Sequence, residues 1–305
     1  MGSPGFALPS LEALVGSGRY TPMLVVSQPD RESGRGKRLH PTPVKARALE
    51  LGLPVEEMSR ENYADVAAGI VALGPDYIVV VAFGIIIRSD LLELPKYGCI
   101  NVHASLLPKY RGVSPIQAAI QSGDSETGCT TMLIDAGVDT GDILLWESTP
   151  VLPDDTAGTL SDRLARLGAG LLVCTLDGLR DGSVKRLPQD DSRASYVRKI
   201  KKNHGRIDWS HSARVVDRHI RAMSPWPSAF TFHGGRRLIV EDAVVSPRPA
   251  DTAAGPGVVA SLDPFTVACA EGALEIRRLK PEGKKSMTPA AYLVGHALAA
   301  GDKLE

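Results

Sequence analysis

Residues 77–84, YIVVVAFG, decide the fold class, because they form a nearly continuous apolar run. Such a run is typical of a strand that is covered on both faces, as central strands of parallel sheets are. A second strand, GCINVH, follows at residues 98–103, and an earlier one, PMLVVS, lies at residues 22–27. Residues 43–51 between them have helical composition. This alternation predicts an α/β domain with a Rossmann-like, mostly parallel sheet.

A long helix closes this first domain, which we expect to span residues 1–181. Residues 156–178 carry leucines at helical spacing: Leu160, Leu164, Leu167, Leu171, Leu172 and Leu176. After them, residues 182–200 are mostly polar and charged, and are predicted to be a linker.

Short strands dominate the rest of the chain, residues 201–305. After a helical segment around residues 210–223, five strand candidates are separated by Gly, Pro and Asp, at residues 230–233, 237–245, 257–260, 265–270 and 273–279. Five short strands predict a small, OB-like β-barrel. Trp209 and Trp226 are predicted to pack in its core.

Composition excludes several classes of protein. The 35 basic and 35 acidic residues give zero net charge, which argues against a protein that coats nucleic acid nonspecifically. The four cysteines are scattered as in a reducing compartment, and neither cysteines nor histidines have metal-ligand spacing. No membrane span or secretory segment is evident, nor any sign of an obligate protein partner. We expect a cytoplasmic protein without a metal.

Asn101 and His103 are the first candidates for chemistry. They alternate along a strand, so they project from the same face at its carboxyl end, where open α/β sheets place ligands. An amide donor beside an imidazole suits acyl transfer, because the reaction needs an oxyanion donor and a group that manages a proton. Taken alone, such a pair is more often structural than catalytic.

Two further motifs favour a catalytic role for Asn101 and His103. SLLP at residues 105–108 follows the histidine, and DAGVDTGD lies at residues 135–142. Together with Asn101 and His103, they resemble the folate-dependent formyltransferase family. The resemblance implies the co-substrate 10-formyltetrahydrofolate and no metal. It also implies a catalytic trio and a folate site: Asn101, His103 and Asp139 for catalysis, and Ser105, Leu106, Leu107, Pro108, Phe83, Gly84 and Ile85 for folate.

The formyl acceptor is indicated by residues outside this core. Residues 28–45, QPDRESGRGKRLHPTPVK, combine flexible glycines with cations that can pair with phosphates: Arg31, Arg35, Lys37 and Arg38. The alternative is a solvated basic loop. This segment resembles the pattern of methionyl-tRNA formyltransferases, as do RIDW at 206–209, PWP at 225–227 and LKPEGKKSM at 279–287. The resemblance implies that the loop and the second domain bind tRNA. It further implies that methionyl initiator tRNA receives the formyl group, for translation initiation.

Three other functions share parts of this sequence pattern. The nearest is a formyltransferase that acts on a small-molecule amine, either a glycinamide ribonucleotide or a nucleotide-linked amino sugar. A noncatalytic RNA-binding protein is disfavoured by the presence of all three candidate catalytic residues. A dinucleotide oxidoreductase is disfavoured because no G-x-G-x-x-G follows a predicted strand.

The beginning of the chain departs from the family pattern. Family members usually begin with an apolar strand that runs into Gly-Ser/Thr-Pro-x-Phe, whereas Met1 here directly precedes GSPGF at residues 2–6. We therefore expect the first strand of the sheet to be missing. That strand would be central, so its neighbours would lack backbone partners and covered apolar area.

Overall fold

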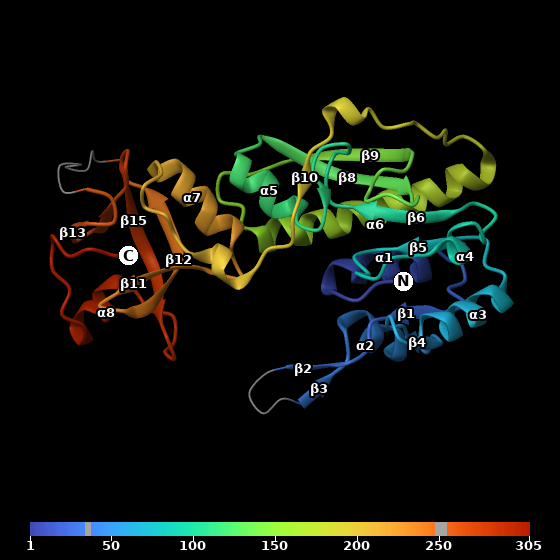
Figure 1. The fold of residues 1–305 in the computed structure, drawn as a ribbon, viewed down its shortest axis with the longest axis horizontal. Coiled ribbons are helices and arrows are strands. Elements are labelled where there is room, and N and C mark those ends of the chain that lie inside the picture. Colours follow the sequence, from blue (N-terminus) through green and yellow to red (C-terminus); the bar gives the residue numbers. More distant parts are fainter. Residues whose placement is uncertain (34–37, 248–254) are drawn as a thin grey trace. The chain divides into compact units, whose positions relative to one another are not determined.

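The computed structural model describes residues 1–33, 38–247 and 255–305. Its chain divides into two compact units (Figure 1). The first comprises residues 1–115, 126–150 and 161–197, and the second comprises residues 116–125, 151–160 and 198–305. Residues 116–125 and 151–160, which the sequence predicted to lie in the first domain, are thus grouped with the second unit.

The first unit contains a sheet in two pieces. Strand β1 (Val25–Ser27) pairs in parallel with β4 (Val55–Glu57). A four-stranded piece has the order β5 (Ile78–Val80), β6 (Cys99–His103), β8 (Glu126–Leu133) and β9 (Ile143–Pro150). The three strands predicted in this half are confirmed. The predicted parallel pairing holds for β1–β4 and β5–β6, whereas the β6–β8 and β8–β9 pairs are antiparallel.

Helices cover both faces of this sheet. One apolar cluster joins it to α1 (Leu8–Gly16), which the turn η1 (Gly5–Ala7) precedes, to α2 (Pro43–Glu50) and to α6 (Ala157–Asp181). A second cluster joins it to α3 (Tyr63–Leu73) and α4 (Ser89–Leu92). Ile100 belongs to the first cluster and its neighbour Cys99 to the second. Successive side chains of β6 thus point to opposite faces, and both faces are apolar because both are covered.

The first residues of the chain lie between the two pieces of the sheet. The Gly2 amide donates to the Val26 carbonyl at 3.0 Å, and the Val81 amide donates to the Met1 carbonyl at 2.9 Å. The Met1 ammonium donates to the Val79 carbonyl at 2.6 Å, and its burial lowers its pKa to about 6. One or two residues therefore form the whole backbone connection between β1 and β5 in the described part of the chain.

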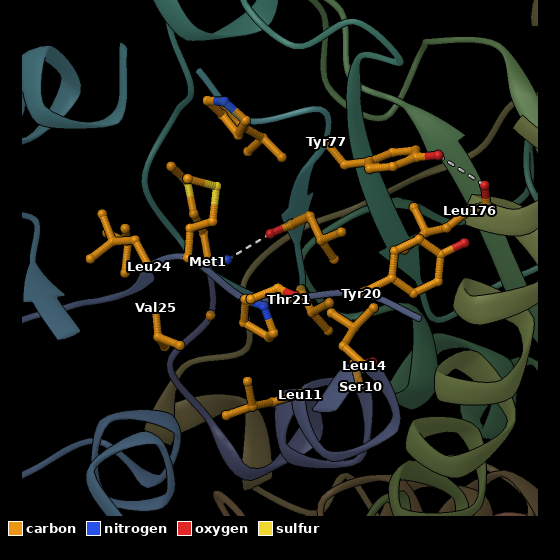
Figure 2. A pocket seen from close by; sticks show the side chains of 18 of the residues that line it. Met1, Ser10, Leu11, Leu14, Tyr20, Thr21, Leu24, Val25, Tyr77 and Leu176 are labelled. Carbon is orange, nitrogen blue, oxygen red and sulfur yellow. Dashed lines mark hydrogen bonds between the residues drawn. The ribbon is translucent and has the colours of Figure 1, made fainter. Parts of the chain in front are cut away.

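A cavity of about 430 Å³ continues from Met1 between β1 and β5. Figure 2 shows Met1, Leu11, Leu14 and Val25 around it, with the ammonium bonded across the gap. Further apolar side chains that line it include Ile78, Val79 and Leu176. Apolar side chains form most of the lining, which also includes Ser10, Arg19 and Asp76, and strand backbone lies on two sides.

Two short paired strands lie within the predicted basic segment, residues 28–45. Strands β2 (Arg31–Ser33) and β3 (Arg38–His40) pair antiparallel, and Figure 1 shows them extending away from α2. The guanidinium of Arg31 is exposed and hydrogen-bonds the side-chain oxygen of Gln28. Arg35 and Lys37 lie outside the described residues.

The predicted linker, residues 182–200, contains ordered elements that pack on the first unit. They are the turn η2 (Asp191–Arg193) and β10 (Tyr196–Val197), which pairs in parallel with β7 (Arg111–Gly112). The turn η3 (Lys202–Gly205) follows in the second unit. The division between the units falls after residue 197.

The second unit is built on a five-stranded antiparallel sheet. Its order is β11 (Ala229–His233), β12 (Arg236–Val245), β15 (Ala273–Pro281), β14 (Phe265–Ala268) and β13 (Val259–Leu262). The five predicted strands are thus confirmed, with small differences at their ends. Its helices are α5 (Pro115–Ser122), α7 (Ala213–Ala222) and α8 (Pro289–Gly295).

The last residues bond to both edge strands of that sheet. Glu305 exchanges two backbone hydrogen bonds of 3.0 Å with Phe232 of β11. Val259 of β13 donates to Asp302 at 2.8 Å and accepts from Gly301 at 2.9 Å. The carboxyl-terminal tail therefore covers edges that would otherwise expose unpaired backbone groups.

The two tryptophans differ. Trp209 is 4% exposed and its indole donates to the Thr231 hydroxyl at 3.1 Å, so its predicted packing is confirmed. Trp226 is 50% exposed, and the same prediction is wrong for it. It lies between two prolines in the turn that joins α7 to β11, outside the sheet.

In the described ranges, no helix combines the length and apolar character needed to cross a membrane.

Candidate functional site

The predicted site residues gather at the carboxyl ends of two neighbouring parallel strands. Val80 of β5 is in register with Asn101 of β6. Residues 83–85 follow the end of β5, and residues 105–108 follow the end of β6. Both predicted folate segments therefore leave the same edge of the sheet, the edge at which open α/β sheets bind ligands.

Asn101 and His103 lie two residues apart on β6 and so share one face of the strand. Asn101 is half-buried, and its side-chain amide makes no hydrogen bond with any residue that the structure describes. Its N–H groups remain available to an external acceptor.

His103 is buried, and each of its ring nitrogens faces a different oxygen. Nε2 lies 2.9 Å from the Tyr110 carbonyl, and Nδ1 lies 3.6 Å from Oδ2 of Asp139. A carbonyl oxygen can only accept, so Nε2 carries a proton in this arrangement. The Nδ1–Oδ2 separation is too long for a hydrogen bond but short enough for an ion pair. A second proton, on Nδ1, would point at the carboxylate.

Asp139 reaches the histidine from the connection between β8 and β9. Asp135 shapes this connection, because its Oδ1 accepts from the Gly137 amide at 3.0 Å and from the Thr140 hydroxyl at 2.6 Å. Asp139 has a φ of 55°, which a non-glycine residue adopts rarely. Its Oδ2 accepts from the Gly112 amide at 2.7 Å. The structure thus brings the carboxylate of Asp139 to His103.

The SLLP segment is a tight turn fixed by hydrogen bonds to Lys109 and to Thr130 of β8. The Ser105 hydroxyl donates to the Lys109 carbonyl at 2.5 Å. The Thr130 hydroxyl donates to the Ser105 carbonyl at 2.7 Å and accepts from the Leu107 amide at 3.1 Å. Ser105 and Leu107 are buried, whereas Leu106 and Pro108 are half-buried. Leu106 and Pro108 therefore present the accessible side chains of this turn.

The segment after β5 likewise combines a buried residue with accessible ones. The Phe83 side chain is 1% exposed and belongs to the core, and its carbonyl accepts from the Gln28 side chain at 2.7 Å. Gly84 is exposed at a φ of 77°, and a Cβ there would lie 2.8 Å from Nε2 of Gln28. This position therefore favours glycine. Ile85 is half-buried.

Tyr110 and Gly112 are contacts that the sequence did not reveal. They supply the carbonyl that faces His103 and the amide that holds Asp139. Their sequence signal was their place in KYRG, directly after the SLLP turn.

Within the described ranges, no cluster of three or more His, Cys, Asp or Glu residues could hold a metal ion. The cavity of Figure 2 is lined by none of the three catalytic candidates.

Two family models match the chain: Formyl transferase over residues 10–176, and Formyl transferase, C-terminal domain, over residues 199–297. The methionyl-tRNA formyltransferase of Moorella thermoacetica is 43% identical over 304 residues, which cover 100% of this chain and 97% of that protein. The methionyl-tRNA formyltransferase of Trichlorobacter lovleyi is 44% identical over 306 residues, covering 100% and 95%.

A solved structure is similar at lower identity. The N-formyltransferase from Helicobacter canadensis, in complex with folinic acid and dTDP-3-aminofucose, has a TM-score of 0.64 at 20% identity. The match covers 90% of this chain and 95% of that one. Similarity at this level of identity supports the fold.

Proposed function

The chain belongs to the formyl transferase family, and from this premise we propose that it transfers the formyl group of 10-formyltetrahydrofolate to the α-amino group of methionyl initiator tRNA. The observation that carries the proposal is the identity of 43% and 44%, over all of this chain, with two methionyl-tRNA formyltransferases. The reaction belongs to translation initiation, and the cytoplasm is its proposed location.

The small-molecule alternative has weaker support. The N-formyltransferase from Helicobacter canadensis, in complex with dTDP-3-aminofucose, is only 20% identical to this chain. The basic hairpin and the second unit, by contrast, carry the segments that resemble the tRNA-dependent enzymes. A tRNA acceptor therefore accounts for more of the chain.

The proposed folate site comprises residues 83–85 and 105–108. Their support is their position beyond the carboxyl ends of β5 and β6. Gly84, Ile85, Leu106 and Pro108 offer accessible surface to the co-substrate. The buried residues Phe83, Ser105 and Leu107 would hold the two segments in shape. The reduced folate would bring an activated formyl group, carried on its N10 atom, to this site.

The reaction forms one bond and breaks another. The neutral α-amine of the acceptor attacks the formyl carbon, a new C–N bond forms, and the carbon's bond to N10 breaks. The proton lost by the amine must finally reach N10. We assign the N–H groups of Asn101 to the developing oxyanion, because they have no other partner among the described residues.

His103 and Asp139 would manage the proton. When Nδ1 is protonated, the imidazolium faces the Asp139 carboxylate at 3.6 Å while Nε2 still donates to Tyr110. Nδ1 can therefore hold a proton from the amine, with the Asp139 carboxylate beside it as the counter-charge, without loss of the Tyr110 contact. This arrangement suits general acid–base catalysis, in which one group takes a proton and returns it later.

The tRNA would contact cations in both units. Arg31, Arg35, Lys37 and Arg38 are proposed to bind phosphates of the acceptor arm. In the second unit, exposed cations lie on β15 and on the turn after it: Arg277, Arg278, Lys284 and Lys285. Phosphate contacts position a nucleic acid without reading its sequence, so these residues would supply affinity rather than discrimination among tRNAs.

Two finer features of the fold are also proposals. The second unit is proposed to be an OB-like barrel of residues 201–305, and the bonds of its tail to both β11 and β13 support closure of the sheet. In the first unit, catalytic domain residues 1–181 are proposed to accept one further strand. The apolar cavity between β1 and β5 supports a place for it directly before Met1.

An acceptor comparison tests the proposed function. The protein and 10-formyltetrahydrofolate would be offered methionyl initiator tRNA, methionyl elongator tRNA, glycinamide ribonucleotide and free methionine, and formylated product would be measured. We expect the highest kcat/KM with methionyl initiator tRNA. Preference for glycinamide ribonucleotide or free methionine would overturn the tRNA assignment.

A further inference from the structure

The segment that joins the two units is bonded to the first unit along its length. We call residues 187–197 the strap. At one end, Leu187 exchanges backbone hydrogen bonds of 2.8 and 2.9 Å with Ile143, just beyond the Asp139 connection. At the other end, β10 pairs with β7, so that Tyr196 is in register with Arg111 and Val197 with Gly112. The strap therefore spans the site from the Asp139 side to the Tyr110 side.

Gln189 joins the strap to the backbone around Asp139. Its Nε2 donates to the carbonyls of Asp139 at 2.9 Å and Gly141 at 2.7 Å. Its Oε1 accepts from Nε of Arg111 at 3.0 Å and from Nη2 at 2.8 Å. Both donors and both acceptor positions of the amide are thus occupied. A single side chain ties the Asp139 connection to Arg111.

Arg111 gives this contact a rigid support. The residue is 1% exposed. Besides Gln189, its guanidinium donates to the Tyr196 hydroxyl at 2.9 Å and to the Asp191 carboxylate at 2.7 Å, both on the strap. A buried guanidinium with several partners has one favourable orientation, because losing a partner would leave a charged donor without compensation.

Ser195 holds the other contact of His103. Its hydroxyl accepts from the Tyr110 amide at 2.8 Å, and its carbonyl accepts from the Arg111 amide at 2.8 Å. Tyr110 has a φ of 61°, which is unfavourable for a tyrosine. These two bonds secure that conformation, and with it the Tyr110 carbonyl that accepts from Nε2 of His103.

We infer that Gln189 and Ser195 are positioning residues that fix the ring orientation and proton arrangement of His103 through its two neighbours, Asp139 and Tyr110. The inference rests on the proposed catalytic role of the His103–Asp139 pair. Both neighbours have a positive φ, which is uncommon for non-glycine residues, so bonds from outside the local segment help to hold them. The strap supplies it from sequence positions 50 and 85 residues away.

Gln189→Glu tests the Asp139 side. A carboxylate can still accept from Arg111 but cannot donate to the carbonyls of Asp139 and Gly141. We expect kcat to fall by about 10- to 100-fold, the size of effect that a misplaced catalytic group produces, with KM for charged tRNA unchanged. The profile of kcat against pH should shift as well. Asp190→Asn is the matched control, because Asp190 is exposed and its carboxylate bonds Ser192 within a local turn.

Ser195→Ala tests the Tyr110 side, with Ser192→Ala as its control on the same strap. Nitrogen NMR of the His103 ring provides a readout that does not depend on catalysis. Wild-type protein should show a proton on Nε2, and both Gln189→Glu and Ser195→Ala should alter the ring signals, while the controls should not. Unchanged ring signals and pH profiles in both variants would overturn the inference. Loss of kcat that only parallels a lower unfolding temperature would overturn it too.

The same set of proteins separates this inference from the proposed function. His103→Ala removes the group whose positioning is at issue. Suppose that His103→Ala formylates normally, while the His103 ring signals of Gln189→Glu still differ from those of wild type. The catalytic assignment of His103 then fails, and the positioning role of Gln189 stands.

Discussion

His103 can hold one proton or two without changing its contacts. Nε2 donates to Tyr110 in either state, and only Nδ1, which faces Asp139, gains or loses its proton. The change in charge is therefore confined to the side of the ring that has a carboxylate beside it. Such confinement favours proton transfer over a structural role, because a merely structural histidine would be satisfied by the Tyr110 bond alone.

Removal of Asn101 or His103 should nearly abolish transfer. Asn101→Ala is expected to lower kcat by about 10² to 10³, because an oxyanion donor is lost. His103→Ala is expected to lower it by about 10² to 10⁴, because the acid–base group is lost. Steady-state formylation of charged tRNA measures both. Circular dichroism and thermal unfolding must show that the variants are folded, and near-normal turnover by either folded variant would refute its assignment.

At the scale of the element, the proposed role of the hairpin β2–β3 is to bind tRNA phosphates through its positive charges. Its arms are ordered strands, so Arg31 on β2 is presented on a defined support. Phosphate binding at such a support releases counterions, and the affinity then depends on salt.

Replacement of Arg31, Arg35, Lys37 and Arg38 by alanine should raise KM for charged tRNA more than it lowers kcat. The log–log dependence of binding on salt should become shallower by about one for each lost phosphate contact. Filter binding at several salt concentrations measures this. A control variant removes three exposed cations elsewhere in the first unit, Arg60, Lys185 and Arg186, by alanine substitution. Equal losses in the two variants would exclude a specific role for the hairpin.

Helix α7 contains a histidine that should make stability depend on pH. Burial lowers the pKa of His219 below its usual 6.5, and Nδ1 accepts from the Gln121 amide at 3.4 Å in the neutral ring. The folded state therefore binds the proton less readily than the unfolded state. Stability is fully present above pH 6.5 and falls as the pH drops below it, by about 1.4 kcal/mol for each unit of pKa difference.

His219→Gln should flatten this dependence. Thermal unfolding of wild type and variant would be compared from pH 8 to pH 5. His40→Gln is the control, because His40 is an exposed histidine that does not contribute to the lowered pKa of His219. If the wild-type and His219→Gln curves keep the same slope below pH 6.5, another group is responsible.

At the scale of the whole molecule, the first unit has a sheet that is nearly divided. Among the residues that the structure describes, residues 1–2 alone connect β1 with β5, while a mostly apolar cavity continues the line of the strand beyond Met1. An added strand would meet backbone donors and acceptors on both sides and apolar side chains on both faces. It would also convert the buried Met1 ammonium into an ordinary amide.

A short Val/Ile extension placed directly before Met1 should therefore raise thermal stability and activity. Burying one such side chain contributes roughly 1.5–3 kcal/mol, so a rise in Tm of about 5 °C or more is expected. Differential scanning calorimetry measures it. A Gly/Ser extension of equal length is the control, and equal Tm values for the two extended proteins would show that the cavity does not accept a strand.

The sequence alone determined the features that depend on local pattern. Apolar runs at residues 77–84 and 98–103 predicted β5 and β6, and turn residues between short runs predicted all five strands of the second unit. The order of Asn101, His103, SLLP and DAGVDTGD indicated formyl transfer through its resemblance to the folate-dependent formyltransferase family. Alternation of apolar side chains and short motifs can be seen along the chain without knowledge of its neighbours in space.

Tertiary structure decided which distant groups meet. Gly112 holds Asp139 across 27 positions, Ser195 holds Tyr110 across 85, and residues predicted to be a linker became a strap. The antiparallel pairing of β8 and β9 and the exposure of Trp226 were likewise undetermined by local pattern. The physical reason is that rare backbone conformations, at Tyr110 and Asp139, are stable only when bonds from remote segments secure them, and no local preference of the chain encodes those bonds.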